Sequence, residues 1–358
     1  MKVALILPGA VWFAPFVKIY TTYLENKNID YSIISWNRDG GDPPYQFQYN
    51  IKPKNGHGRA TLKEYWYYFK YVRTVLRNQK FDRIIAFCSQ TACMLADLLT
   101  TKYKGRYMID YRDLSLEQRF GFKQLYSYVL KRSSLNVVSS PGFLKCLPKA
   151  EYVISHNFDI ALVLNELNRK REISSFYKKN DNIRVLTIGG IRDYSSNVQI
   201  VNALANKSGF EVGFVGKGNA APLLEKHAEE IGAKNISFSG YYEKKDEPKY
   251  IEEASYINIY YPRIITHDTA MSNRFYNSLL YKKPMIVTKN TTQGDFVEKY
   301  GLGVAIENCD GLEDKLKNFM QSDYKQYEER CNQLLKKFIN DYNVFDKSLN
   351  AFLKNEKN

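Results

Sequence analysis

Short apolar runs alternate along the chain with longer segments in which apolar side chains recur at helical spacing. In the first half, the predicted strands are Val3–Leu7, Tyr31–Trp36, Arg83–Phe87, Tyr107–Asp110, Leu135–Ser139 and Tyr152–Ser155. The helices predicted between them are Phe13–Glu25, Leu62–Asn78, Thr91–Thr101 and Leu116–Lys131. Strands that alternate with helices are typical of a parallel sheet with helices on both faces.

The second half repeats this alternation. Its predicted strands are Arg184–Ile188, Glu211–Val215, Ile236–Ser239, Ile257–Tyr260, Met285–Thr288 and Gly303–Ile306. Its predicted helices are Val198–Asn206, Ala220–Ile231, Pro248–Ala254, Asn273–Tyr281 and Leu312–Met320. Two tail helices follow, Tyr327–Ile339 and one that ends near Leu353, and the sequence leaves open whether they pack on the second domain or return to the first.

The fold class predicted from this pattern is α/β, with two doubly wound, Rossmann-like domains. The chain has 358 residues, which is more than one hydrophobic core usually covers. We place the domains at residues 1–160 and 161–358, separated by a cleft, with tail helices from about residue 325. The segment 158–180 reads as helical and charged, so the boundary between the domains is soft.

Composition adds little that is specific. No run of about 18 apolar residues is long enough for a membrane-spanning helix, and the apolar start continues as patterned protein rather than as a signal peptide. The five cysteines lack metal-ligand spacing, which favours reduced thiols in or near the core. They are Cys88, Cys93, Cys146, Cys309 and Cys331.

Charge is distributed unevenly. The chain carries a net +14, with 23 basic and 11 acidic residues up to His156 and 29 and 27 from Asn157 onward. A basic half next to a nearly neutral half indicates that the first half faces an anionic partner. Nucleic acid, anionic lipid and a phosphorylated substrate all fit the charge alone.

Glycine-rich or polar segments follow four predicted strands of the second half. In a parallel sheet these positions meet at one edge, where helix N-termini present free N–H groups to ligands. Their candidate binding residues are Gly189, Gly190, Arg192, Gly216, Lys217, Tyr241, Tyr242, Ser272, Asn273 and Arg274. Any one segment could be an ordinary turn, but their convergence predicts a pocket for a diphosphate, with a tyrosine to stack on a ring. No GxGxxG follows a first strand, which disfavours hydride transfer.

Nearly the whole chain resembles the GT-B glycosyltransferases, and most closely the retaining family-four type found in bacterial polysaccharide synthesis. The segments that carry the resemblance are "IGGIRDYSSN", "FVGKGN", "ISFSGYYEKKDEPKYIEEASYINIYYP" and "SNRFYNSLLYKKPMIVT". In that family the last segment holds an acid that grips the ribose of the donor, and this position is Asn277 here. The companion acid falls on Thr269, beside Asp268, and a lysine of the family falls on Asn197.

The resemblance also covers the first half, with lower specificity. "YMIDYRDLS" resembles the acceptor-side segment of the family and places Asp110, Arg112 and Asp113 at a strand end. Gly9 would open space for the acceptor after the first strand, and His156 would lie at the crossing between domains. A surface cluster of ion pairs at 110–113 and a capping role for His156 remain alternatives.

The resemblance implies that a sugar is transferred from a nucleotide-diphosphate donor to an acceptor hydroxyl with retention of anomeric configuration. Arg192, Arg274 and Lys217 would stabilise the diphosphate as it leaves, and Asp110 or Asp113 would act on the acceptor. No DxD-like motif is present, so we expect no metal and no cofactor besides the sugar donor.

The segment Arg59–Lys80 interleaves cations with aromatic residues. Such segments suit attachment to an anionic membrane surface, and the resemblance implies a lipid-linked saccharide acceptor at the inner face of the cell membrane. The same segment also reads as a core helix with the apolar face Leu62, Trp66, Phe69, Val72 and Leu76.

Two other functions stay open. A nucleotide-sugar epimerase of the same fold would need acids and histidines in the cleft, and the chain has four His. A non-catalytic sugar-nucleotide binding protein would explain why Asn277 and Thr269 stand where the family has acids. Binding of nucleic acid is disfavoured, because no known motif accompanies the charge.

Overall fold

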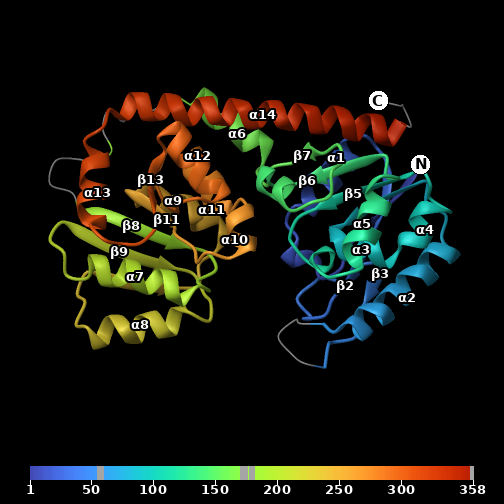
Figure 1. Ribbon diagram of the computed structural model, residues 1–358, viewed down its shortest axis with the longest axis horizontal. Helices are drawn as coiled ribbons and strands as arrows, with labels where there is room; N and C mark the ends of the chain where they lie inside the picture. The colour runs from blue at the N-terminus through green and yellow to red at the C-terminus, as the bar shows by residue number, and fades with distance from the viewer. Residues whose placement is uncertain (55–59, 170–175, 177–181, 355–358) are drawn as a thin grey trace. The chain divides into compact units, whose positions relative to one another are not determined.

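The computed structural model describes residues 1–54, 60–169, 176 and 182–354 (Figure 1). The chain divides into two compact units. Unit 1 comprises Met1–Asn157 and Asp341–Asn358, and unit 2 comprises Phe158–Asn340. The sequence placed the division at 160/161 and left the place of the tail open. Within the described residues, no helix is both long enough and apolar enough to cross a bilayer.

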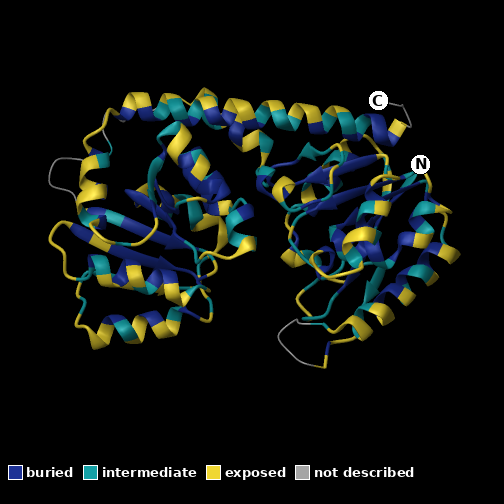
Figure 2. Cartoon of the chain, viewed as in Figure 1, coloured by how far each residue is buried: buried dark blue, intermediate teal, exposed yellow. Residues whose placement is uncertain are grey.

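Unit 1 is built on a parallel sheet of seven strands in the order β3-β2-β1-β4-β5-β6-β7. The strands are β1 (Lys2–Ile6), β2 (Asp30–Trp36), β3 (Phe47–Tyr49), β4 (Arg83–Phe87), β5 (Tyr107–Tyr111), β6 (Leu135–Val138) and β7 (Val153–Ile154). The helices are α1 (Val17–Asn26), α2 (Leu62–Asn78), α3 (Cys88–Met94), α4 (Ala96–Thr100) and α5 (Phe122–Leu130). The central strands are buried on both faces, and β4 and β5 are buried at every position and mostly apolar (Figure 2).

The two faces of this sheet are covered by different helices. Tyr20 and Leu24 of α1 share a hydrophobic core with Leu5, Ile85 and Phe87 of the strands. Parallel crossovers are right-handed, so α1 and the helices that follow β3, β4 and β5 lie on opposite faces. Helices α2 to α5 therefore form one layer of unit 1.

Unit 2 contains a parallel sheet of six strands in the order β10-β9-β8-β11-β12-β13. The strands are β8 (Ile183–Ile188), β9 (Phe210–Val215), β10 (Ile236–Gly240), β11 (Tyr256–Ile259), β12 (Met285–Thr288) and β13 (Gly303–Ile306). The helices are α6 (Ile160–Asn168), α7 (Tyr194–Leu204), α8 (Ala221–Glu230), α9 (Glu247–Glu253), α10 (Ile265–Thr269), α11 (Asn273–Tyr281), α12 (Thr292–Tyr300) and α13 (Leu312–Met320). The strand order reverses beside β8, and such a switch point is where open α/β sheets bind ligands.

The tail is a single helix, α14, from Tyr324 to Lys354. The two tail helices expected from the sequence are therefore one, and the prediction of a break near residue 340 is wrong. Its first part supplies Tyr327, Leu334 and Phe338 to a core of unit 2. Its last part supplies Phe345 and Leu349 to the core of unit 1. One helix therefore contributes to both hydrophobic cores.

Both doubly wound sheets were predicted from the sequence, and most element bounds agree within a few residues. The sequence missed the edge strand β3, which has three residues, and the helices α10 and α12. It also merged two elements in places: Leu116–Lys131 is a 3-10 turn at Leu116–Gln118 followed by α5, and Thr91–Thr101 is parts of α3 and α4. Short elements carry too few apolar positions to show a period.

Candidate functional site

The turn after β8 holds two glycines and faces two arginines. We define the β8 corner as Gly189, Gly190, Arg192 and Arg274. Arg192 follows the turn directly, and its Nε would lie 3.3 Å from a Cβ built on Gly190. Arg274 donates from Nη2 to the carbonyl oxygen of Gly190 at 2.9 Å. The two arginines therefore border the same glycine.

Arg274 is held by the ends of two strands. Its Nε donates to the carbonyl oxygen of Ile188 at 2.6 Å, and its Nη1 donates to that of Asn258 at 3.3 Å. The side chain is 8% exposed. A guanidinium has five N–H donors, so three bonds to backbone carbonyls leave two donors for a ligand. Arg274 thus stabilises the strand ends as well as bringing charge to the corner, a structural role that the sequence did not indicate.

Local capping explains why Arg274 points at this edge. Ser272 is the N-cap of α11, and its hydroxyl accepts from the N–H of Phe275 at 3.3 Å. The hydroxyl of Ser272 in turn donates to Oε1 of Gln293 at 2.7 Å. The helix therefore begins at Asn273, and Arg274 lies in its first turn.

The glycines after β8 and β9 have different reasons to be glycine. A Cβ on Gly216 would lie 2.0 Å from the carbonyl oxygen of Gly189, and a Cβ on Gly218 would lie 2.0 Å from that of Ile191. These two glycines let the β8 and β9 turns pack together. Gly189 instead has φ +96° and open space, with only the Tyr242 hydroxyl near, at 3.9 Å. Close approach of a ligand thus fits Gly189 and Gly190, whereas Gly216 serves packing.

The predicted tyrosines and lysine lie beside the corner. Lys217 is exposed, and its Nζ lies 5.5 Å from the centre of the Tyr241 ring. Tyr241 is 71% exposed, which leaves its ring available for stacking. Tyr242 is half-buried, and its hydroxyl donates to Oε1 of Glu247 at 2.9 Å. Burial and the Glu247 carboxylate raise the pKa of Tyr242, and the nearby positive charge of Arg274 lowers it.

Three positions where the resemblance implies charge are neutral, and their side chains turn to other partners. Asn197 is buried and accepts from Nδ2 of Asn258 at 3.1 Å, so it cannot replace a phosphate-binding lysine. Asn277 donates to Oε2 of Glu247 at 3.2 Å. Thr269 is buried and donates to the carbonyl oxygen of Ile265 within α10 at 2.6 Å.

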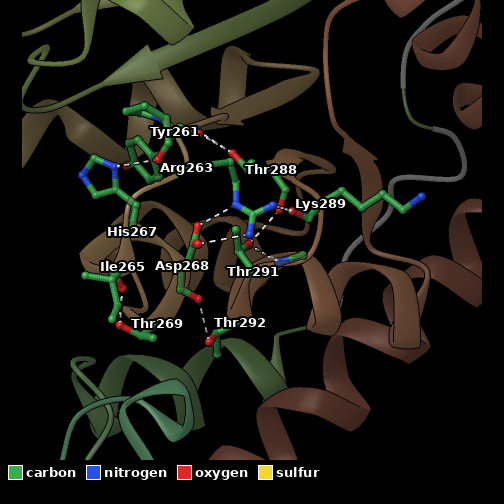
Figure 3. Close-up of polar contacts among 12 residues, drawn as sticks. Tyr261, Arg263, Ile265, His267, Asp268, Thr269, Thr288, Lys289, Thr291 and Thr292 are labelled. Atoms are coloured by element: carbon green, nitrogen blue, oxygen red, sulfur yellow. Dashed lines mark hydrogen bonds and ion pairs between the residues drawn. The ribbon is translucent and has the colours of Figure 1, made fainter. Parts of the chain in front are cut away.

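The loop before α11 is fixed by its own polar contacts (Figure 3). Arg263 makes a bidentate pair with Asp268, at 2.8 and 3.1 Å. The hydroxyl of Thr292 donates to the Asp268 backbone carbonyl at 3.0 Å. Asp268, the acid next to Thr269, is therefore occupied by a structural ion pair.

In unit 1, Asp110 lies at the end of β5 and is fully buried. Its Oδ2 accepts from the Tyr20 hydroxyl and, at 2.6 Å, from Nη2 of Arg112. Arg112 also donates to the Ser155 carbonyl oxygen at 3.1 Å. Burial lowers the pKa of Arg112, but Asp110 and Tyr20 reverse this effect and raise it overall. The cluster is a buried ion pair rather than the surface cluster weighed from the sequence, and no oxygen of Asp110 faces solvent.

The other first-half candidates lie around this pair. Asp113 is exposed and accepts from the N–H of Leu114 at 2.9 Å. The space expected beside Gly9 is filled, because Nη2 of Arg38 would lie 3.2 Å from a Cβ there. His156 is buried and pairs through Nε2 with Asp341 of α14 at 3.0 Å. Its position favours a structural role.

A buried carboxylate that the sequence did not single out lies close by. Glu117 is 1% exposed and accepts from the Ser89 hydroxyl, from the Tyr111 hydroxyl at 2.5 Å and from the N–H of Ser115 at 2.8 Å. Its neighbours are uncharged hydroxyl and amide groups, so no charge pattern marked it. Cys93 lies near this carboxylate; burial, with Glu117 adding to it, raises the pKa of its thiol to about 12.

The layer of unit 1 that α2 to α5 form exposes aromatic and basic side chains. On α2, Phe69, Val72 and Leu76 are buried, whereas Leu62 and Trp66 are exposed, so only part of the expected apolar face packs inward. Of the cations in Arg59–Lys80, Arg73 is bound to Asp97 at 2.7 Å, and Arg59 lies outside the described residues.

Comparison with known proteins supports the same architecture. The family model for the C-terminal domain of glucosyltransferase 3-like proteins matches residues 229–350. Sucrose-phosphate synthase from Thermosynechococcus elongatus is similar over 98% of this chain and 99% of its own, with 13% identity and a TM-score of 0.68. The fold is that of the GT-B glycosyltransferases.

Two further solved structures share the fold. Anabaena HepE in complex with UDP and glucose is 14% identical, covers 98% of this chain and 100% of its own, and has a TM-score of 0.63. A UDP-N-acetylglucosamine 2-epimerase from Methanocaldococcus jannaschii, in complex with UDP-GlcNAc and UDP, is 14% identical. The similarity covers 95% of this chain and 99% of the epimerase, with a TM-score of 0.54. No curated protein sequence matches the chain significantly.

Proposed function

We propose that this protein is a retaining glycosyltransferase that moves a sugar from a nucleotide-diphosphate donor to a hydroxyl of a lipid-linked saccharide in cell-surface polysaccharide synthesis. The observation that carries the proposal is the pairing of Arg192 and Arg274 around Gly190 at the switch point of the unit 2 sheet. The glucosyltransferase-like segment at residues 229–350 supports the reaction class. The UDP bound by Anabaena HepE supports the donor class.

The chemistry follows from where charge develops. When the bond between sugar and β-phosphate breaks, negative charge grows on the departing diphosphate, and donors already in place stabilise it without reorganisation. Arg192 offers an exposed guanidinium that makes no hydrogen bond or ion pair with the described residues, and Arg274 offers the two donors that its backbone contacts leave. Lys217 adds a third cation at the neighbouring turn. These cations would take the place that a metal ion has in other transferases, so we propose that transfer needs no metal.

On the acceptor side, the layer that α2 to α5 form in unit 1 supports attachment to the anionic inner face of the cell membrane. Trp66 and Tyr67 are exposed on α2, and Lys70 lies 5.6 Å from the centre of the Trp66 ring. An aromatic ring beside a cation suits the boundary between lipid headgroups and acyl chains.

A second part of the same layer carries more charge. Between Gln118 and Lys149 the chain has six basic residues and no acid. A cavity of about 510 Å³ at α5 is lined by Lys123, Gln124, Ser127, Tyr128, Lys131, Arg132 and Pro148. Phe120, just before α5, is 98% exposed. Basic residues near anionic lipid contribute about 1 kcal/mol each, so this helix strengthens the case for a membrane surface.

The donor site can be tested by a thermal-shift panel of UDP, GDP, ADP and CDP and their sugars. A ligand that binds the folded protein raises the melting temperature by mass action. We expect at least one nucleotide diphosphate to stabilise the protein and Arg192→Ala to remove that shift. If no member of the panel raises the melting temperature, the proposed donor site is wrong.

The runner-up function is a nucleotide-sugar epimerase, which the similarity in fold to the M. jannaschii enzyme favours. Incubation with UDP-N-acetylglucosamine alone separates the two. An epimerase converts the sugar of the donor without an acceptor, whereas a transferase leaves its configuration unchanged. If the protein binds the nucleotide sugar but converts none of it, even when an extract that contains acceptors is added, it is a non-catalytic binding protein instead.

A further inference from the structure

The acid that the sequence lacks at position 277 has a structural counterpart on another helix. Glu247 is the first residue of α9, yet its carboxylate meets Asn277 of α11, whose Nδ2 donates to Oε2 at 3.2 Å. Its Oε1 accepts from the Tyr242 hydroxyl at 2.9 Å, and Lys244 pairs with Oε2. A negative charge therefore lies against the side chain that stands where the resemblance expects one.

This carboxylate belongs to the surroundings of the β8 corner. Tyr242, its partner, places its hydroxyl 3.9 Å from a Cβ built on Gly189. The positive charge of Arg274 also acts on Tyr242 and lowers its pKa. The order of groups is thus two arginines at Gly190, then Gly189 with Tyr242, then Glu247 with Asn277. A ligand whose diphosphate lies at the arginines would reach Glu247 with the group attached to the phosphates.

An ordinary structural role accounts for only part of this arrangement. An acid in the first turn of a helix interacts favourably with the helix dipole, and a pair with Lys244 is a common surface contact. Neither explains why the side chain turns toward α11 and Tyr242. The Glu247 side chain is 13% exposed, which leaves it accessible, whereas the Lys244 side chain is 77% exposed and free to move away. Among the described residues Oε1 accepts one hydrogen bond, from Tyr242, so it can accept a second.

We propose that Glu247, from α9, supplies the carboxylate that accepts hydrogen bonds from the ribose hydroxyls of the donor. The inference rests on the proposed function, because it assumes that a nucleotide diphosphate occupies the β8 corner. A carboxylate only accepts hydrogen bonds, so it suits a diol, which donates two. Asn277 orients this carboxylate through its amide. The carboxylate that accepts the ribose hydrogen bonds has therefore moved from α11 to α9.

The test compares ribose with its deoxy forms. Binding of UDP, 2′-deoxy-UDP and 3′-deoxy-UDP to the full chain is measured by calorimetry, with the GDP and ADP sets alongside so that the base is not assumed. The wild-type protein should prefer the ribonucleotide over at least one deoxy form by about tenfold or more, as a hydrogen bond to a charged group implies. Glu247→Gln should bind both forms with similar affinity, close to that of wild type for the deoxy form.

Glu243→Gln is a matched control, because Glu243 is an exposed acid of the same loop that pairs with Lys245 at 2.5 Å. It should keep the wild-type preference. A second variant moves the acid back: Glu247→Gln combined with Asn277→Glu should restore a preference for ribose. Restoration would not follow if Glu247 acted only through the fold.

The outcomes are distinct. If wild type binds no ribonucleoside diphosphate, the proposed function fails and this inference fails with it. If wild type binds but Glu247→Gln keeps the full preference for ribose, only the role of Glu247 is overturned. The same holds if Glu247→Gln lowers the affinity for both forms equally and also lowers the melting temperature. Equal affinity of wild type for ribose and both deoxy forms would also overturn it.

Discussion

The carboxyl ends of the two sheets both hold charged side chains, but in different surroundings. In unit 1, Asp110 and Glu117 are buried carboxylates whose partners come from their own unit. In unit 2, Arg192 and Lys217 are exposed cations at the turns after β8 and β9, and Arg274 keeps two donors free. The same topology therefore buries an ion pair at one sheet edge and exposes cations at the other. In the buried pair, Oδ1 of Asp110 and Nε of Arg112 have no hydrogen-bond partner among the described residues, but burial keeps both from a ligand in solution. A charged residue at a strand end therefore indicates a ligand only where the ligand can reach it.

The largest effect on stability should come from unit 1. Arg112→Met leaves Asp110 without its cation in a buried site, and loss of one partner of a buried ion pair costs about 3–5 kcal/mol. Urea unfolding with and without the substitution measures the loss. A loss below about 1 kcal/mol, the range of surface pairs, would show that the pair is not structural.

The same substitution in unit 2 should act on the reaction instead. Arg192 is exposed and makes no hydrogen bond or ion pair with the described residues, so Arg192→Met should change stability by no more than about 0.5 kcal/mol. It should lower kcat by about a hundredfold or more, because one charge-stabilising group is worth about 3 kcal/mol. Steady-state kinetics with the nucleotide sugar found in the thermal panel provide the measurement. Wild-type kcat in this variant would remove the contrast between the units.

Arg274→Ala should combine both effects, so it separates them less clearly than Arg192→Met does. The change removes three hydrogen bonds to backbone carbonyls at the ends of β8 and β11. Unsatisfied buried acceptors are costly, so the fold itself should weaken.

Membrane binding should depend on the basic residues at α5 in unit 1 and not on those of unit 2. Liposomes with anionic lipid should float the protein at low salt, and charge reversal at Lys123, Lys131 and Arg132 should weaken flotation, since each cation contributes about 1 kcal/mol. Reversal of the exposed unit 2 residues Lys226 and Lys234 serves as the control. Equal effects of both sets would mean that net charge, rather than the α5 surface, controls binding.

A smaller effect should appear at high pH. Burial raises the pKa of Tyr20, Tyr68 and Tyr126 in unit 1 well above the usual value, and that of Tyr152 to about 12. Since the unfolded chain loses these protons first, near pH 10, the free energy of unfolding should fall as pH rises through that range. The buried thiol of Cys93, whose pKa is also raised, adds to this fall from about pH 8.5. Urea unfolding between pH 8 and 11, with tyrosinate absorbance, tests the sign. Stability that rises above pH 10 would contradict it.

The smallest expected change is none at all. The described residues contain no group of three His, Cys, Asp or Glu side chains arranged to hold a metal ion. Because cations already serve the diphosphate, EDTA should leave the transfer rate unchanged. Loss of activity that Mg²⁺ or Mn²⁺ restores would contradict the proposal that arginines do this work in unit 2.

The sequence could predict what depends on neighbours in the chain. Strand β12 and helix α11 were predicted with the bounds that the structure shows, because a Ser cap and a Lys-Pro stop lie next to them. It could also place Arg192 and Arg274 at one sheet edge, because parallel strands end together. It could not show that Gly216 is needed for packing against Gly189, because that contact joins two separate turns.

What the sequence missed depends on pairs far apart in the chain. Glu247 and Asn277 are 30 residues apart, and only the packing of α9 against α11 brings them together. Glu117 gave no signal because its partners Ser89 and Tyr111 are ordinary polar residues. A residue-by-residue comparison with a family finds the loss of an acid at one position but not its supply from another helix.

Helix α14 makes the amino-terminal half dependent on the last residues of the chain. A fragment that stops at Asn157 would keep every strand of its sheet but would lack Phe345, Leu349 and Phe352, and the apolar surface around Tyr20 and Leu24 would meet water. During synthesis this half therefore completes its core only after the whole of the other half has been made. Separate expression of the amino-terminal half should yield folded protein only if the peptide 341–354 is fused back onto it.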